Sequence, residues 1–444
     1  MKEIDKNKIE KEILRINNKY KYTWENEGKK ILLDEKKIKI TEEEKKILEI
    51  LLIQEIPNDL RKYLWIICSG SKLLMKENKD NYLKLINSYE QMEKENHYFY
   101  KYLTYKISRD LYRSNLKDEE VYKLKNILNA FIIRDLSINY CQGLNLIVSH
   151  LLTINNYKEE ETFYLFVKLM EDILPFDYYL FAIGIEAEIN IINILLKKFE
   201  FELYSHLNGL NCICFLESKI SIWVSSLMLF KIDVKITNLF FDCLFFLCVN
   251  HNNFISILYT IIFSIITILK TDLLKCHNSS DISDIIDNFA NNPLSDENYK
   301  KLVYYNLISQ DKNKFNDKSI LELRKKVIEE IIKTKTINYK FEENKKEIIC
   351  NKKYPLCIKE KEEKPIEKFI IYKSKNPLNI YIIDDFYYGK NEIEENKENQ
   401  DNILESKINI VNKEKNSKEE NISEQKINSD IENLIIERRK HFCE

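Results

Sequence analysis

Apolar residues recur at intervals of three and four positions along most of the chain, which is the period of an amphipathic helix. Helix-start signals precede two of these stripes, because Thr41-x-x-Glu44 and Ser319-x-x-Glu322 both have the spacing of a capping box. The first box is followed by Ile47, Leu48, Leu51 and Leu52, and the second by Leu323, Val327 and Ile331. Alternating strand patterns are scarce between the two boxes. The pattern therefore predicts a single all-α, multi-helix domain over residues 45–335.

The two ends of the chain differ from this helical region in composition. Residues 1–44 are rich in charge, and we expect them to form an N-terminal charged extension. Residues 336–444 are charged and amide-rich with few large apolar side chains, so they cannot bury enough surface to offset the entropy of ordering. A low-complexity, largely disordered C-terminal tail is expected there.

One stretch, residues 254–269, raises the question of a membrane. It carries no charge over its sixteen residues, whereas a spanning helix usually needs about 20. The flanking triplets HNN and KTD also lack the aromatic and basic anchors that are typical of membrane spans. A buried core helix is the favoured interpretation, and a transmembrane span is the alternative.

Composition narrows the classes of function. The 69 basic and 71 acidic residues give a net charge of −2, which disfavours a protein that binds nucleic acid by bulk attraction. The ten cysteines form no CxxC pair, and the histidines lack zinc-ligand spacing, so no metal site is predicted. Free thiols in a reducing cytosol are expected. The charged N-terminus has no apolar core, so no secretory signal is expected.

A glycine follows a glutamine in the motif NYCQGLN, residues 139–145, although the chain has only six glycines. An apolar stripe then predicts a buried helix that begins just after Gln142 and contains Leu144, Ile147, Val148, Leu151 and Leu152. Free N–H groups and the helix dipole at such a start favour a nearby anion. A polar residue that merely begins a helix is the alternative interpretation of Gln142.

A second motif lies upstream, where helical spacing puts Ile107, Asp110 and Arg113 on one face. An ordinary surface pair of aspartate and arginine is one interpretation. However, only eight of the 69 basic residues are arginine, and half of those eight lie between the start of the helical region and the glutamine, at positions 61, 109, 113 and 134. In a lysine-biased chain this choice indicates a need for a planar, permanently charged fork.

A third motif, IPNDLRKYLW at residues 56–65, comes earlier still. Pro57 suits the first turn of a helix, and the helix would bury an inner face made of Leu60, Leu64 and Ile67, with Trp65 alongside. Packing alone accounts for most of this motif. Packing does not account for the order of all three motifs in one helical domain.

The ordered set resembles the TBC domain, a helical family of GTPase-activating proteins for Rab GTPases. The family patterns Ile-Pro-x-x-Leu-Arg-x-x-x-Trp, Ile-x-x-Asp-x-x-Arg and Tyr-x-Gln match residues 56–65, 107–113 and 140–142. The likeness continues through residues 159–179, the segment around Trp223, and Phe241-Asp242, and it covers residues 45–335. Three positions depart from the family pattern, with consequences for loop geometry or partner choice: Glu55, Asn139 and Phe241.

The resemblance implies that the chain accelerates GTP hydrolysis by a Rab GTPase. Arg113 would be the arginine finger and Gln142 would orient the attacking water. Supporting roles fall to Arg61, Asp110, Tyr140, Gly143 and Asn145, with Asp110 paired to an arginine on another helix. The small Gly143 would let the backbone of the partner approach. A catalytically inactive TBC-like scaffold or Rab effector is the alternative.

The same resemblance implies the molecular setting. The chain would have no enzymatic activity or cofactor of its own, because GTP and Mg²⁺ belong to the partner. That partner would be a Rab-family GTPase in its GTP-bound form, and the process would be vesicle trafficking. We expect a cytoplasmic protein that contacts endomembranes peripherally and indirectly, through the Rab, and that binds no nucleic acid.

Overall fold

The computed structural model describes residues 5–34, 37–94, 98–111, 114, 116–135, 140–175, 177–179, 182–247, 251–309, 315 and 318–334. Over these residues the chain is helical and contains no strand, so the prediction of an all-α fold is confirmed. The predicted tail, residues 336–444, lies outside the described residues, as does Arg113.

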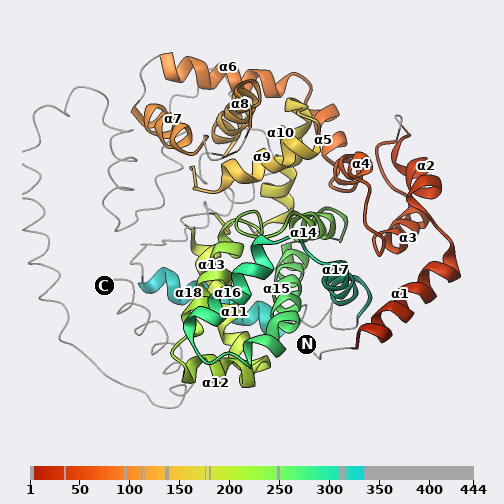
Figure 1. Ribbon diagram of the computed structural model, residues 1–444. Helices are drawn as coiled ribbons and strands as arrows, with labels where there is room; N and C mark the ends of the chain where they lie inside the picture. The colour runs from red at the N-terminus through yellow and green to blue at the C-terminus, as the bar shows by residue number, and fades with distance from the viewer. Residues whose placement is uncertain are drawn as a thin grey trace, which may run out of the picture. The chain divides into compact units, whose positions relative to one another are not determined.

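The helices follow one another with short connections (Figure 1). The first half of the chain contains α1 (Lys6–Tyr20), α2 (Lys29–Leu32), α3 (Glu42–Leu51), α4 (Asn58–Cys68), α5 (Ser71–Glu77), α6 (Asn81–Lys94), α7 (Tyr98–Leu111), α8 (Asp118–Arg134), α9 (Leu144–Ile154) and α10 (Glu159–Lys168). The second half contains α11 (Ile183–Phe199), α12 (Phe201–Gly209), α13 (Ile213–Ser225), α14 (Val234–Leu247), α15 (His251–Leu273), α16 (Ser279–Asn291), α17 (Asp296–Val303) and α18 (Lys318–Thr334). Short π-helical turns occur at η1 (Trp24–Gly28), η3 (Leu169–Ile173) and η5 (Tyr304–Ile308).

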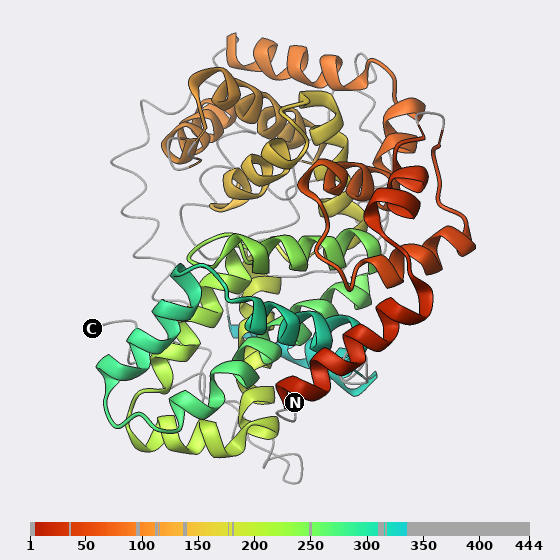
Figure 2. The same ribbon diagram turned by 45° about the vertical axis from the view of Figure 1, so that its right-hand side comes forward.

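Two groups of helices pack among themselves (Figures 1 and 2). Helices α5 to α10 form one group, and α11 to α18 form the other, in which α11 and α18 run along each other. Helix α14 packs on α15 and also on α4, which in turn contacts α5, α9 and α10, so α4 and α14 connect the two groups. Segments far apart in sequence therefore meet where α4, α9 and α14 come together.

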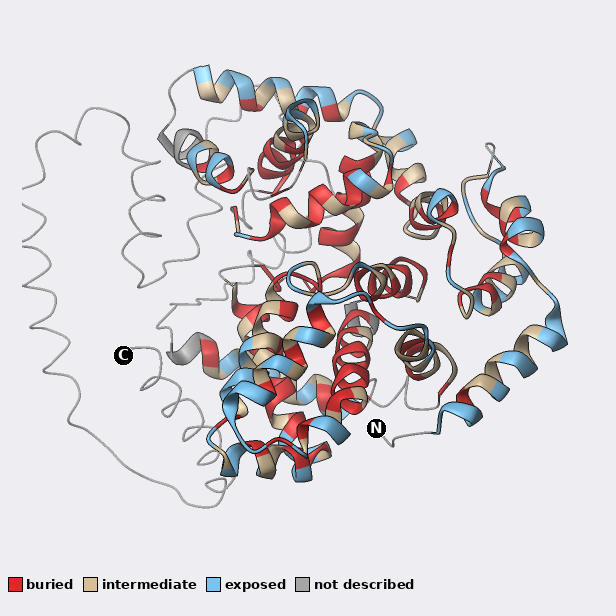
Figure 3. Cartoon of the chain, in the orientation of Figure 1, coloured by how far each residue is buried: buried red, intermediate tan, exposed pale blue. Residues whose placement is uncertain are grey.

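Helix α15 is a core helix of this fold. Its segment Phe254–Leu273 is long and apolar enough to cross a membrane by length and composition, but 78% of the apolar stretch within it is buried inside the protein. Figure 3 shows the helix coloured as buried along most of its length. It packs against α14, α16 and α17, which supply the apolar surroundings that its sequence requires.

The N-terminal segment is charged, as expected, but it packs against the helical domain rather than extending from it. Helix α1 lies along α17, and the side chains of Trp24, Ile31 and Leu32 are buried in the core. Ile9, Ile13 and Ile16 of α1 have helical spacing, and residues 31–33 form a short apolar run, so the sequence carries a packing signal that the many charged residues obscure.

The two predicted capping boxes have different outcomes. The Thr41 hydroxyl accepts from the Glu44 backbone N–H, and the Glu44 carboxylate accepts from the Thr41 N–H, so the first box is confirmed. The second prediction is wrong, because α18 already begins at Lys318 and Ser319 lies inside its first turn. Its apolar stripe is nevertheless correct, since Val327 and Ile331 are buried.

Candidate functional site

The glutamine of the Tyr140–Gly143 motif lies on an exposed turn directly before α9. The Gln142 side chain is exposed and forms no hydrogen bond with any residue that the structure describes. As predicted, α9 begins just after it, and the stripe of Leu144, Ile147 and Val148 is buried. The turn thus presents a polar side chain with donor and acceptor atoms to the surroundings of the protein.

Gly143 is required by the conformation of this turn. Its φ angle is +107°, a region that side chains other than glycine rarely adopt. The backbone carbonyl of Ser225, at the end of α13, lies 3.5 Å from the position that a Cβ atom on Gly143 would take. The end of α13 therefore packs directly against the glutamine turn.

Tyr140 connects the turn to the end of α7. Its hydroxyl donates a hydrogen bond to Oδ2 of Asp110 over 3.0 Å, and both side chains are buried. A carboxylate that is buried and hydrogen-bonded holds its neighbours in a defined position, because the unpaired group would be costly. The NYCQGLN motif and the motif at residues 107–113 are thereby joined in space.

Helix α9 makes two further bonds to the same segment. Nδ2 of Asn145 donates to the backbone carbonyl of Asp110 over 2.9 Å, and the hydroxyl of Ser149, one turn later, donates to the carbonyl of Ser114 over 2.9 Å. All of these residues are buried. Arg113 itself lies outside the described residues, but the chain on both sides of it is hydrogen-bonded to the helix that follows Gln142.

Ser149 and Ser114 were not among the site residues predicted from sequence. A signal for Ser149 existed, because Asn145 and Ser149 are polar residues one turn apart on a helix that is otherwise almost wholly apolar. Nothing in the sequence indicates the acceptor at Ser114, because the two residues are brought together only by packing of α9 against the end of α7.

Cys141, between the tyrosine and the glutamine, is partly buried. Burial raises the pKa of its thiol to about 11, which the nearby Asp110 carboxylate reinforces and Lys106 opposes. The thiol therefore stays protonated and unreactive near neutral pH. Cys141 and the other described cysteines are free thiols that form no disulfide, as the sequence predicts.

Arg61 was expected to support the segment that carries Arg113, but it bonds to a different part of the fold. Its Nε lies 3.1 Å from Oδ1 of Asp242 on α14, its Nη2 donates to the carbonyl of Ile56, and Nε1 of Trp65 donates to the same Asp242 oxygen. Burial raises the pKa of Asp242 to about 6, although Arg61 opposes this shift. Arg61 thus joins α4 to α14, and its described contacts do not include the 107–113 segment.

The other described arginines of this region also have definite surroundings. Arg134, at the end of α8, forms a two-pronged ion pair with Glu171 of η3, with distances of 2.6 and 3.0 Å, and both side chains are buried. Arg109 is exposed and lies over the ring of Tyr105. These contacts do not include Asp110, whose carboxylate accepts from the Tyr140 hydroxyl.

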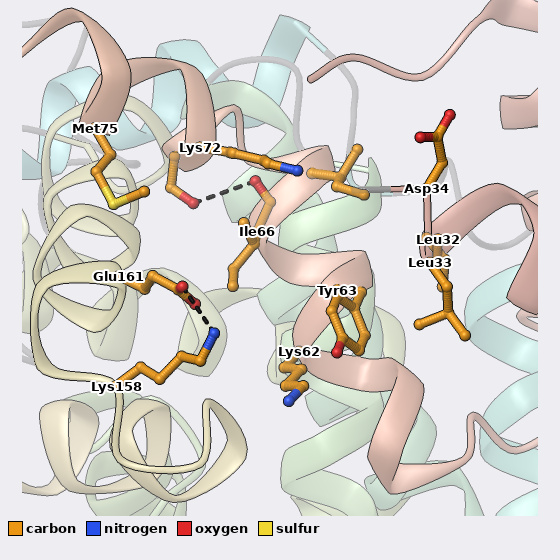
Figure 4. A pocket seen from close by; sticks show the side chains of 12 residues that line it. Leu32, Leu33, Asp34, Lys62, Tyr63, Ile66, Lys72, Met75, Lys158 and Glu161 are labelled. Atoms are coloured by element: carbon orange, nitrogen blue, oxygen red, sulfur yellow. Dashed lines mark hydrogen bonds and ion pairs between the residues drawn. The ribbon is translucent and has the colours of Figure 1, made fainter. Parts of the chain in front are cut away.

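A cavity of about 500 Å³ lies elsewhere, next to α4, α5 and the start of α10. Figure 4 shows its lining, which mixes apolar side chains such as Met75 with charged ones such as Lys62 and the ion-paired Lys158 and Glu161. None of the residues around Gln142 lines it. Among the described residues there is also no cluster of His, Cys, Asp or Glu side chains that could hold a metal ion.

The fold and the site define an all-helical domain in which two of the three motifs meet behind the turn that presents Gln142, while the motif at residues 56–65 bonds to α14. Residues 58–274 match the family model described as the Rab-GTPase-TBC domain. This part of the chain is therefore a Rab-GTPase-TBC domain, and the resemblance carried by the three motifs is confirmed.

Individual relatives are more distant. Growth hormone-regulated TBC protein 1-A of Danio rerio is 29% identical over 154 residues, which are 32% of this chain and 40% of that protein. Growth hormone-regulated TBC protein 1 of Xenopus laevis is 26% identical over 239 residues, or 52% of this chain and 65% of that protein. The chain thus spans less than two thirds of these curated relatives. The crystal structure of the Chlamydomonas flagellar RabGAP TBC domain superposes with a TM-score of 0.49 at 16% identity, covering 68% of this chain and 95% of that one.

Proposed function

We propose that this protein is a GTPase-activating protein for a Rab-family GTPase in its GTP-bound form. Arg113 acts as an arginine finger and Gln142 orients the attacking water, both supplied in trans. The observation that carries the proposal is the pair of hydrogen bonds from Asn145 and Ser149, which tie α9 to the carbonyls of Asp110 and Ser114. The helix that follows Gln142 is therefore hydrogen-bonded to the chain just before and just after Arg113, the proposed finger.

The chemistry explains why these residue types are needed. Hydrolysis of bound GTP develops charge on the transferring phosphoryl oxygens, and catalysis consists mainly of positioning and electrostatic stabilisation. A guanidinium fork neutralises that charge, and a glutamine amide offers one acceptor and two donor hydrogens to a water molecule. GTP and Mg²⁺ come with the partner, and the chain contributes side chains only.

The surroundings of the turn suit this role. Gln142 is exposed, so a partner can reach its side chain, whereas Gly143 is buried and the side of it that lacks a Cβ atom faces the Ser225 carbonyl of the same chain. That Gly143 admits the backbone of the partner stays a prediction. Asp110, Tyr140 and Asn145 act as positioning residues because their hydrogen bonds are buried behind the turn. Small displacements matter, since a shift of about 1 Å can cost on the order of a hundredfold in rate.

The biological setting follows from the same proposal. A protein that inactivates Rab GTPases regulates vesicle trafficking from the cytoplasm, and it reaches endomembranes through the Rab that it binds. The burial of α15 supports this setting, because the apolar helix is already covered within the protein.

A panel of purified Rab GTPases tests the proposal. Multiple-turnover GTP hydrolysis is measured with catalytic amounts of the full chain, and at least one Rab is expected to be stimulated. Binding of a GTP-loaded Rab without any stimulation across the panel would favour the inactive scaffold or effector instead.

A further inference from the structure

A buried ionic cluster lies on the second group of helices, away from the three sequence motifs. Arg324 of α18 donates from Nε to Glu188 of α11 over 2.6 Å, and from Nη1 and Nη2 to both oxygens of Asp177 over 3.0 and 2.5 Å. The hydroxyl of Tyr259 on α15 also donates to Glu188. One guanidinium thus joins α18, α11 and the segment that leads into α11, and it lies beyond the part of the chain that matches the family model.

The segment held by Arg324 continues toward α13. Next to Asp177, the hydroxyl of Tyr178 donates to the carbonyl of Val224 over 2.6 Å, and the hydroxyl of Tyr179 reaches the carbonyl of Ser225 at 3.4 Å. Both tyrosine side chains are buried. These two bonds fasten the last turn of α13, where backbone carbonyls have no partner within the helix.

The end of α13 is also the surface that meets the glutamine turn. The Ser225 carbonyl faces Gly143, because it lies 3.5 Å from the position that a Cβ atom there would take. Tyr179 lies near the same turn, because its hydroxyl reaches the Ser225 carbonyl that faces Gly143. Asp177, Tyr179 and Ser225 therefore form a continuous set of contacts between α18 and Gly143.

We propose that Arg324 is a positioning residue for the Gln142 turn. Its guanidinium holds Asp177, the adjacent tyrosines hold the end of α13, and the Ser225 carbonyl supports Gly143. Only the expected effect of Arg324 on catalysis rests on the proposed function. The effect of Arg324 on the position of the turn can be measured without a Rab.

A substitution at Asp177 can weaken the connection between Arg324 and the end of α13 without a general loss of folding. Removing Arg324 would leave the buried carboxylates of Asp177 and Glu188 facing each other, which is strongly destabilising. Asp177→Asn instead leaves Arg324 and Glu188 as a neutral pair. Val327→Ala is the matched control, because Val327 is buried on α18, the helix that carries Arg324, but has no part in the ionic cluster.

The first readout is the reaction of Cys141 with a maleimide in the full chain, followed by mass spectrometry of the labelled peptides. The wild-type thiol should react slowly because it is partly buried and its raised pKa keeps it protonated. We expect Asp177→Asn to raise the Cys141 labelling rate about tenfold or more, as local opening does, and Val327→Ala to leave it unchanged at a temperature where both variants are equally stable. Equal labelling of Cys141 in the two variants would overturn the proposal.

The second readout separates kcat from KM in Rab-stimulated GTP hydrolysis. A displaced glutamine should lower kcat by roughly ten- to a hundredfold with little change in KM for the Rab, and Val327→Ala should preserve both. An equal fall of kcat in the two variants would contradict the link. If the wild-type chain stimulates no Rab, the proposed function fails, and Cys141 labelling alone decides the inference about position.

Discussion

The side-chain amide of Asn145 donates a hydrogen bond to the backbone carbonyl of Asp110, with the two atoms 2.9 Å apart and both residues buried. The bond joins the first turn of α9 to the last turn of α7. It therefore connects the exposed Gln142, three residues before Asn145, with the segment that leads to Arg113.

Asn145→Ala is expected to lower stimulated hydrolysis roughly ten- to a hundredfold, because the loss of this bond loosens the two catalytic segments relative to each other. The stability cost should be about 1–3 kcal/mol, as for other buried hydrogen bonds. Single-turnover hydrolysis and chemical unfolding measure the two effects. Asn306→Ala is the control, since Asn306 is also buried and its side-chain amide donates to the Leu302 carbonyl of α17; a matching loss of stimulation in that variant would contradict the assignment.

Arg113→Ala should leave the fold intact and lower stimulated hydrolysis by about 10³ or more, the scale attributed to an arginine supplied in trans. Arg113→Lys should also be poor, because a point charge does not replace the planar fork. Arg109→Ala is the matched control, since Arg109 is an exposed arginine on α7, four positions earlier in the chain. Retention of most activity in Arg113→Ala would show that the finger has been assigned wrongly.

Gln142 distinguishes a mechanism with two catalytic side chains from one in which arginine acts alone. If Gln142 orients water in place of the glutamine of the GTPase, a Rab that lacks its own glutamine should still be stimulated by the wild-type chain. Gln142→Ala should lose most stimulation while it still binds the Rab more weakly in a transition-state-like complex. The measurement is single-turnover hydrolysis for the four combinations of native and substituted glutamine on each side. Full dependence on the glutamine of the Rab, with indifference to Gln142, would be incompatible with this mechanism.

His150 should make the fold sensitive to acid. Burial, together with the nearby charge of Arg61, lowers the pKa of the imidazole from 6.5 to about 3, and the ring packs between Trp65 and Phe241. Below pH 6.5 the imidazole of His150 is protonated in the unfolded chain, whereas in the folded protein it stays neutral down to about pH 3. The free energy of unfolding therefore falls as the pH falls from 6.5 toward 3.

His150→Leu removes this titration and should flatten the dependence of unfolding free energy on pH. Each pH unit between 6 and 4 should cost the wild type about 1.4 kcal/mol more than the variant, the value of one proton. Urea unfolding at several pH values measures the difference. Parallel pH profiles for the two proteins would contradict the lowered pKa.

A chain that ends at residue 340 should retain stimulation in solution. It keeps α18, whose side chains Val327 and Ile331 are buried and whose Arg324 holds Asp177, whereas the residues beyond it contain none of the three motifs. A chain that ends at residue 317 lacks α18 and should not fold cooperatively. Circular dichroism and the hydrolysis assay compare the two; loss of activity in the longer, folded chain would assign part of the active architecture to residues 341–444.

The amino-acid sequence by itself determined the helical class, most of the buried stripes and the identity of the candidate residues. These properties are local, because helical period, capping chemistry and motif spacing all lie within a few residues. The helix after Gln142 and the capping box at Thr41 were predicted correctly for that reason. The packing of the N-terminal helices was missed because the many charged residues of this segment outweigh its apolar positions, although Ile9, Ile13 and Ile16 have helical spacing.

Only the tertiary structure decided which partners these residues have. Arg61 pairs with Asp242, which is 181 positions later in the chain, and Arg324 pairs with Asp177 and Glu188, which are 147 and 136 positions earlier. No local pattern encodes such pairs, because a long side chain can meet any complementary group that packing brings near. The contact of Ser225 with Gly143 has the same origin, since it depends on how the end of α13 packs and not on the sequence around either residue.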